Sequence, residues 1–168
     1  VSHPGRTTPE AHAQVIVHAA ANNRVPLLDA PDTGVVGTLT SLAATDRAVF
    51  GARRAALLAP WAVIPAVAPG ATRTIPYSAV QAGLLARVDG LHGPGQNAAG
   101  LFAGVADSVV GVTQEWGDAD REALNAAGVT VARQIGARVV TYGMRSLADP
   151  AADPGWVGLQ NARVVMAV

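Results

Sequence analysis

Short apolar runs alternate along this chain with segments of helical periodicity, and this order limits the fold more than any other feature. Residues 24–31 and 54–59 are compact apolar runs that end at a proline, which predicts two short core strands. Residues 129–135 and 138–142 are also strand-like, and only a Gly-Ala pair separates them, which is close hairpin spacing. Helices and strands in this alternation predict a mixed α/β architecture of packed layers.

A helix is predicted over residues 9–23, where Thr8 can act as the N-cap and Pro9 suits the first turn. One face of this helix is apolar and consists of Val15, Ile16, Ala19 and Ala20. The opposite face is polar and consists of Gln14, His18 and Asn22. Further elements are expected along the chain, namely helices at 40–47, 78–88 (capped by Ser78), 118–125 and 156–168, a strand at 105–113, and loops at 62–74, 89–100 and 149–154.

The length of 168 residues predicts one compact domain, spanning residues 1–168, with a substantial core. Its 12 basic and 12 acidic residues balance, and the basic residues, all arginine, are scattered. Nucleic-acid binders carry a clustered basic excess, so no nucleic-acid partner is expected. The longest apolar run, near residues 55–68, contains two prolines and is shorter than the roughly 18 residues of a membrane helix, so no membrane insertion is expected.

Both ends of the sequence have the character of cut points. The chain begins Val1-Ser2-His3-Pro4-Gly5, without a methionine or a signal-peptide pattern. It stops at Val168 inside an apolar run that has no capping residue. We therefore expect a fragment of a longer protein. The chain also contains no cysteine, which excludes disulfide bonds, thiolate metal sites and cysteine nucleophiles.

Ser78, Asp89 and His92 raise the question of a hydrolase triad. A serine nucleophile needs a sharp elbow, commonly marked by G-x-S-x-G, together with a base and an oxyanion hole. No serine has that setting, because Ser41, Ser78, Ser108 and Ser146 lie in Thr-Ser-Leu, Tyr-Ser-Ala, Asp-Ser-Val and Arg-Ser-Leu. No triad is predicted.

Other chemistry-bearing residues also lack a specific pattern. His12 and His18 are six residues apart and so fall on different faces of one helix, unlike paired metal ligands, and His3 and His92 lie elsewhere. The remaining candidates have simpler interpretations. The glycines Gly93, Gly95 and Gly100 suit a turn that needs unusual backbone angles. The acidic residues Asp118, Asp120 and Glu122 complement the positive end of a helix dipole, and the three tryptophans, Trp61, Trp116 and Trp156, are expected at core edges or interfaces. No catalytic, cofactor-binding or metal site is predicted, and no enzymatic activity.

The second half of the chain resembles the sheath proteins of contractile phage tails and related injection systems. Five segments carry the resemblance in the family's order and spacing, over roughly two thirds of the chain. They are Arg54–Trp61 (an apolar strand ending in Pro-Trp), Ile75–Asp89 (the family's P-P-S-G-x-x-A-G-x-x-A-R-x-D), His92–Gly100 (its G-x-x-x-A-P-A-N loop, with Asn97 matching the Asn), Leu124–Arg133 (its L-N-x-x-G-I-N-x-I-R) and Arg138–Leu147 (its R-V-W-G-A-R-T-L). Thr130 and Tyr142 replace the family's Asn and Trp, and Asn161-Ala162-Arg163 departs from its double-Arg segment.

The resemblance implies a subtilisin-like α/β sheath domain without a working triad or a cofactor. It implies subunits in hexameric rings, stacked helically around an inner tube and linked by terminal arms that add strands to neighbouring sheets. Contraction is then a rigid-body rearrangement that drives the tube through a target envelope. The implied partners are other sheath subunits, the inner tail tube protein, the baseplate and the tail terminator.

The resemblance also implies a location and a boundary. The location is the contractile tail of a virion, assembled in the host bacterial cytoplasm, or a cytoplasmic bacterial injection particle. The parent protein's terminal arms and C-terminal domain are expected to lie outside residues 1–168. The alternative from the residues themselves is a hydrolase or small-molecule enzyme on an α/β scaffold, which requires a cleft with convergent polar groups and a perturbed acid or base.

Overall fold

The apolar runs of the sequence lie side by side in one four-stranded sheet. The computed structural model describes residues 1–167, and its main sheet has the order β1-β2-β6-β7. Strands β1 (Leu27–Asp29), β2 (Ala56–Ala59) and β6 (Val129–Ile135) are parallel, whereas β7 (Arg138–Tyr142) is antiparallel to β6. The predicted strands and hairpin are thus confirmed, and so is the mixed α/β fold class.

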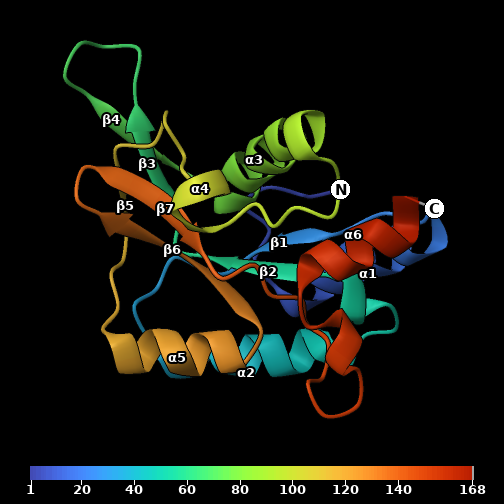
Figure 1. Ribbon diagram of the computed structural model, residues 1–168. Helices are drawn as coiled ribbons and strands as arrows, with labels where there is room; N and C mark the ends of the chain where they lie inside the picture. The colour runs from blue at the N-terminus through green and yellow to red at the C-terminus, as the bar shows by residue number, and fades with distance from the viewer. Residues whose placement is uncertain (168) are drawn as a thin grey trace.

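Helices cover both faces of this sheet (Figure 1). On one face lie α1 (Pro9–Ala21), α2 (Val36–Arg47) and α5 (Asp118–Ala126), and on the other α3 (Tyr77–His92), α4 (Gly100–Ala103) and α6 (Leu159–Ala167). Adjacent side chains of a strand point to opposite faces, so Leu57 joins one core cluster and Leu58 the other, and both are fully buried. A strand covered on both faces must be apolar throughout, which explains the continuous run in β2.

A local signal places the start of α1. The hydroxyl of Thr8 accepts a hydrogen bond from the backbone N–H of Ala11 at 3.4 Å, which confirms the predicted cap of α1. Helix α5 matches its predicted span to within one residue, whereas α2 begins four residues before its predicted start. Two short 3-10 turns, η1 (Ala52–Arg54) and η2 (Pro154–Trp156), precede β2 and α6. No helix within residues 1–167 is long and apolar enough to cross a membrane.

Residues 62–74 form a hairpin, so the loop predicted there was wrong. Strands β3 (Ala62–Pro65) and β4 (Thr72–Ile75) pair antiparallel, and β5 (Gly111–Val112) completes a second sheet in the order β4-β3-β5. The hairpin projects from the body (Figure 1). Its prolines lie at the end of β3 and in the connecting loop, where no ladder hydrogen bond is lost. Three of the four residues of β4 are exposed, so no apolar alternation marked it.

Helix α3 also differs from its predicted form. It extends to His92 through four residues predicted as loop, and its N-cap is Pro76, not Ser78. Ser78 lies inside the first turn and is fully buried. The helix includes Gly90, whose position is open to solvent, and ends at Gly93, whose φ of +80° suits glycine. Of the strand predicted at 105–113, only β5 is formed.

The junction between α5 and β6 requires glycine, which gives a first testable prediction. Gly128 has φ +89°, and a Cβ added there would lie 2.8 Å from the carbonyl oxygen of Ser146. We expect Gly128→Ala to lower the free energy of unfolding, measured in urea, by roughly 1–3 kcal/mol. Alanine is strained at this positive φ, and its Cβ would be too close to the carbonyl oxygen of Ser146. Gly136→Ala is the matched control, since Gly136 has φ +61° but nothing within 4 Å of the added Cβ. An equal loss in both variants would show that the contact at Gly128 contributes nothing.

Candidate functional site

The residues of the hypothetical hydrolase triad lie apart. Ser78 and His92 occupy opposite ends of α3, roughly 21 Å apart along its axis. The hydroxyl of Ser78 donates to Asp29 at 2.6 Å, and Asp89 forms an ion pair with Arg163. The ring of His92 packs against Phe102, with centroids 5.5 Å apart. Each member therefore has a different partner, and the structure brings none of the three together.

The other sequence candidates are likewise dispersed. His3, His18 and His92 are exposed, and His12 is buried. Within residues 1–167 no three His, Asp or Glu side chains are grouped to hold a metal ion. Gly93 ends α3 and Gly100 begins α4. The indole N–H groups of Trp61 and Trp116 donate to the carbonyl oxygens of Ala30 and Gly34, both at 3.0 Å, so these two residues hold loops at the core edge.

A buried ion pair that the sequence analysis did not identify joins α1 to α2. Nδ1 of His12 lies 2.6 Å from Oδ2 of Asp46, and Nε2 lies 3.0 Å and 3.2 Å from the carbonyl oxygens of Arg6 and Asp29. All of these oxygens accept hydrogen bonds, so both ring nitrogens donate and the ring is an imidazolium. Burial by itself lowers the pKa of His12, but the hydrogen bond and charge of Asp46, with the two carbonyl groups, outweigh burial and raise the pKa.

The carboxylate of Asp29 extends this buried network to α3 and to the first residues of the chain. It accepts hydrogen bonds from the backbone N–H of Ser78 at 2.8 Å, from the Ser78 hydroxyl at 2.6 Å, and from the N–H of Gly5 at 3.2 Å. Asp29 also ends β1, so the network ties β1, α1, α2, α3 and residues 5–6 together. One sequence signal for it was present: His12 lies four residues before Ile16, on the apolar stripe of its helix.

The raised pKa of His12 predicts a pH dependence of stability. Because its pKa is higher in the folded than in the unfolded chain, its protonation stabilises the fold. This contribution is complete below about pH 6.5 and is lost as the pH rises through the folded-state pKa. We expect the free energy of unfolding, measured in urea at a series of pH values, to fall over that window. The fall should be absent in His12→Gln and retained in His18→Gln, whose ring is exposed; an identical profile in both variants would contradict the assignment.

A second buried network holds α3 against β7. The hydroxyl of Tyr77 lies 3.0 Å from that of Thr141, which donates to the side-chain oxygen of Gln81 at 2.7 Å. Gln81 in turn donates to the carbonyl oxygen of Ala98 at 3.2 Å. Burial raises the pKa of Tyr77 to about 12, so this phenol is neutral at physiological pH. These polar groups bond to one another and anchor the helix.

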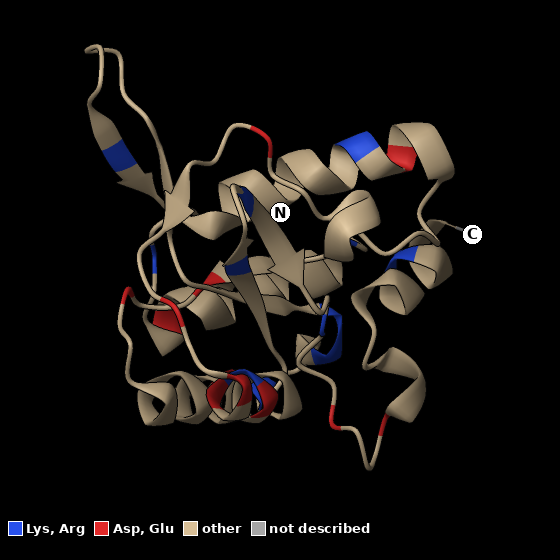
Figure 2. Cartoon of the chain, turned by 60° about the vertical axis from the view of Figure 1, so that its left-hand side comes forward, with Lys and Arg blue, Asp and Glu red and all other residues tan. Residues whose placement is uncertain are grey.

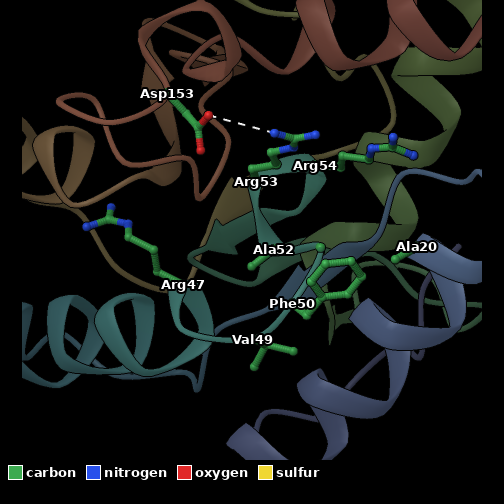
Figure 3. Close-up of a pocket in the computed structure, with 9 residues that line it drawn as sticks. Ala20, Arg47, Val49, Phe50, Ala52, Arg53, Arg54 and Asp153 are labelled. Atoms are coloured by element: carbon green, nitrogen blue, oxygen red, sulfur yellow. Dashed lines mark ion pairs between the residues drawn. The ribbon is translucent and has the colours of Figure 1, made fainter.

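A surface pocket of different character lies at the ends of α1 and α2 (Figure 3). We call it the arginine pocket; its volume is about 380 Å³, and it is lined by Ala20, Arg47, Val49, Phe50, Gly51, Ala52, Arg53, Arg54 and Asp153. The guanidinium of Arg53 lies 4.5 Å from the ring centroid of Trp156 and 3.7 Å from Asp153. Gly51 has φ +93°, and an added Cβ would lie 2.7 Å from Cβ of Ala20, so the pocket wall requires glycine there.

Large apolar side chains are exposed at several places on the surface, and two of these places include a phenylalanine. Phe50 is 87% exposed at the rim of the arginine pocket, and Leu91, Leu101 and Phe102 are exposed where α3 ends and α4 begins. Charged side chains are spread over several elements rather than gathered in one cleft (Figure 2). Exposed aromatic groups beside charges are typical of surfaces that bind other proteins. The geometry therefore favours interaction surfaces as the functional features of this domain.

Comparison with solved structures finds the same fold in contractile sheath proteins. The chain matches the anti-feeding prophage (AFP) helical sheath in its contracted state with a TM-score of 0.71 and 20% identity, over 98% of this chain and 42% of that one. It matches a chain of the six-fold symmetrised AFP baseplate structure with a TM-score of 0.69 and 21% identity, over 95% of this chain and 40% of that one. It matches a chain of the PVC sheath complex of an extracellular contractile injection system, also in the contracted state, with a TM-score of 0.67 and 21% identity. That match covers 84% of this chain and 37% of the other.

The match covers nearly all of this chain but only about two fifths of each sheath chain. A crystal structure of the sheath tail protein from Desulfitobacterium hafniense is more distant, with a TM-score of 0.52 and 17% identity. No family model and no curated protein matches the sequence. The predicted sheath fold is confirmed by these structures.

Proposed function

We propose that this chain is the α/β domain of a contractile-sheath subunit, a structural protein and not an enzyme. The observation that carries the proposal is the match to contracted sheath chains over 98% of its length, with a TM-score of 0.71. The arrangement of polar groups supports a structural role. The buried His12, Asp29 and Ser78 all bond to neighbouring elements of the same chain.

In this proposal the subunits form hexameric rings that stack helically around an inner tube. Such a lattice requires heterologous contacts, in which one patch of a subunit binds a different patch of the next. The sheath then contracts by rigid-body rearrangement of its subunits and drives the tube through a target envelope. The baseplate and the tail terminator bind its two ends. The particle is a phage tail or a bacterial injection system, assembled in the bacterial cytoplasm.

The domain described here supplies a rigid body for this motion. Two core clusters, one on each face of the main sheet, and two buried polar networks fix its helices to its strands. A rearrangement between subunits requires the subunits themselves to hold their shape, because interfaces then switch between discrete packings. Since the chain spans about two fifths of the sheath chains that it matches, we assign the terminal arms that add strands to neighbouring sheets to the remainder of the parent protein.

Electron microscopy of the full-length parent protein, expressed together with its inner-tube protein, tests the proposal. We expect long tubes whose surface has a helical lattice of stacked rings. Expression without the tube protein is the control that shows whether the tube templates this lattice. Monodisperse globular particles at every salt and protein concentration would overturn the proposal.

A further inference from the structure

The arginine pocket has more positive charge than its own residues neutralise. Three arginines line it, against the single carboxylate of Asp153. The ion pair between Arg53 and Asp153 is long, at 3.7 Å, and both side chains are more than a third exposed. A pair of this kind contributes little stability, so its guanidinium remains available to a stronger partner. The pocket therefore suits a ligand that carries carboxylates.

Its guanidinium groups are held in place before any partner arrives. Arg53 and Arg54 lie over the same indole, 4.5 Å and 5.8 Å from the ring centroid of Trp156. Arg54 also donates to the side-chain oxygen of Asn23 at 3.0 Å. Side chains that are already fixed lose less entropy on binding, which favours affinity. Trp156 thus has a role beyond the core edge, since it positions two cations at one surface.

We propose that the arginine pocket binds helix α5 of a second copy of this chain, through the carboxylates of Asp118 and Glu122. The proposal rests on the proposed function, since a sheath requires contacts between unlike patches of its subunits. Residues four apart lie on one face of a helix, about 5–6 Å from each other, so this pair presents two carboxylates together. The side chain of Asp118 forms an ion pair with Arg121 of the same helix but is 95% exposed, and Glu122 is exposed as well. Opposite charges on the two patches select this pairing and fix its orientation.

The apolar part of the pocket fits the same helix. Phe50, at the rim, is 87% exposed, and Val49 and Ala52 line the wall. Ala119 and Ala123 follow the two acidic residues by one position and are also exposed. They too are four residues apart, so they form a small apolar stripe next to the carboxylates. Contact between Phe50 and this stripe covers an aromatic ring that is otherwise in water.

Within one copy the acidic pair lies away from the arginine pocket, toward the start of α2. The start of α5 is near the start of α2, since Trp116 donates to the carbonyl oxygen of Gly34. Arg47, the last residue of α2, lines the arginine pocket. The 12 residues of α2 place Asp118 roughly 18 Å from the pocket along the helix axis, and Glu122, one turn further along α5, lies roughly 12 Å from it. In Figure 1 α5 starts at the lower left, and α1, whose end borders the pocket, lies at the right. The contact therefore joins unlike patches of two copies, and such a contact generates a ring or a helical filament according to the rotation between the copies.

Sedimentation velocity of the chain at increasing concentration tests the contact directly. We expect the sedimentation coefficient to rise with concentration at about 10 mM salt and to stay constant at about 1 M salt, because the Debye length falls from roughly 30 Å to 3 Å. Arg53→Glu with Arg54→Glu should weaken self-association at least about tenfold, and so should Asp118→Arg with Glu122→Arg. The chain that carries all four changes should regain it.

The restored association is specific to the proposed pairing. As a control, Arg73→Glu with Arg138→Glu reverses two exposed arginines away from the pocket. Combined with the α5 reversals, this control should not restore self-association. Absence of self-association in the unchanged chain, or failure of the fourfold variant to recover it with a native circular dichroism spectrum, overturns the proposal. If a reversed variant does not fold, Arg53→Gln with Arg54→Gln and Asp118→Asn with Glu122→Gln replace it, and unchanged association in either overturns the proposal.

These results separate the contact from the sheath role. Association of the chain together with an absence of tubes from the full-length protein supports the contact and overturns the sheath proposal. Tubes from the full-length protein, with no effect of charge reversal on the chain, support the sheath proposal and overturn the contact. The two proposals therefore fail independently.

Discussion

Asp46→Ala is expected to lower the free energy of unfolding by about 3–5 kcal/mol, because it leaves the imidazolium of His12 buried without its counter-ion. Both partners are almost inaccessible to water, and they join α1 to α2 on one face of the main sheet. Urea unfolding at about pH 6, below the usual pKa of histidine, measures the loss with the ring protonated.

The exposed pair of Arg87 and Asp107 is the matched control for this prediction. Its 2.9 Å contact is almost as short, but its side chains are 40% and 76% exposed. Asp107→Ala should therefore change the free energy of unfolding by no more than about 1 kcal/mol. In His12→Ala with Asp46→Ala the losses should not add, because neither residue then remains unpaired. A loss below about 1 kcal/mol for Asp46→Ala alone would contradict the buried ion pair.

Leu57→Ala is expected to cost about 2–5 kcal/mol, because it removes a fully buried side chain from the central strand of the sheet. β2 pairs with β1 on one side and β6 on the other, so the surrounding strands cannot easily move to fill the cavity. Leu91→Ala is the control, since Leu91 is 70% exposed on α3. We expect that change to lie within about 0.5 kcal/mol of zero. Similar losses at both positions, measured in urea, would contradict the packing described for β2.

Segments that are distant in sequence converge around the main sheet, which explains why the resemblance extended over so much of the chain. Asn125 and Arg145 belong to two of its five segments, and Oδ1 of Asn125 accepts from Nε of Arg145 at 2.6 Å. Arg47 donates to the carbonyl oxygens of Leu147 and Ala127, at 3.1 Å and 2.7 Å, beside Gly128. These contacts close the junction between α5, β6 and the residues after β7.

The errors in the predicted elements share one cause, which is that the deciding contacts come from elsewhere in the chain. Ser78 has the chemistry of an N-cap, yet its hydroxyl bonds to Asp29, forty-nine positions earlier. The polar strand β4 pairs with β3 without an apolar face of its own. A helix cap or an amphipathic pattern is a local signal, whereas a ladder partner or a buried carboxylate is not.

Local patterns in the sequence account for the main sheet and for most of the helices that cover it. The apolar run at 54–59 contains strand β2 because burial on both faces requires continuous apolar side chains, and α1 forms because its cap and its stripe are local. The positions of the buried polar groups and of the arginine pocket depend instead on contacts between segments that are distant in sequence. His12 became a buried cation, and Arg53 and Arg54 became one surface, through Asp46 and Trp156, which are distant in sequence. The physical reason is that the charge state and the availability of a polar group depend on its neighbours in space.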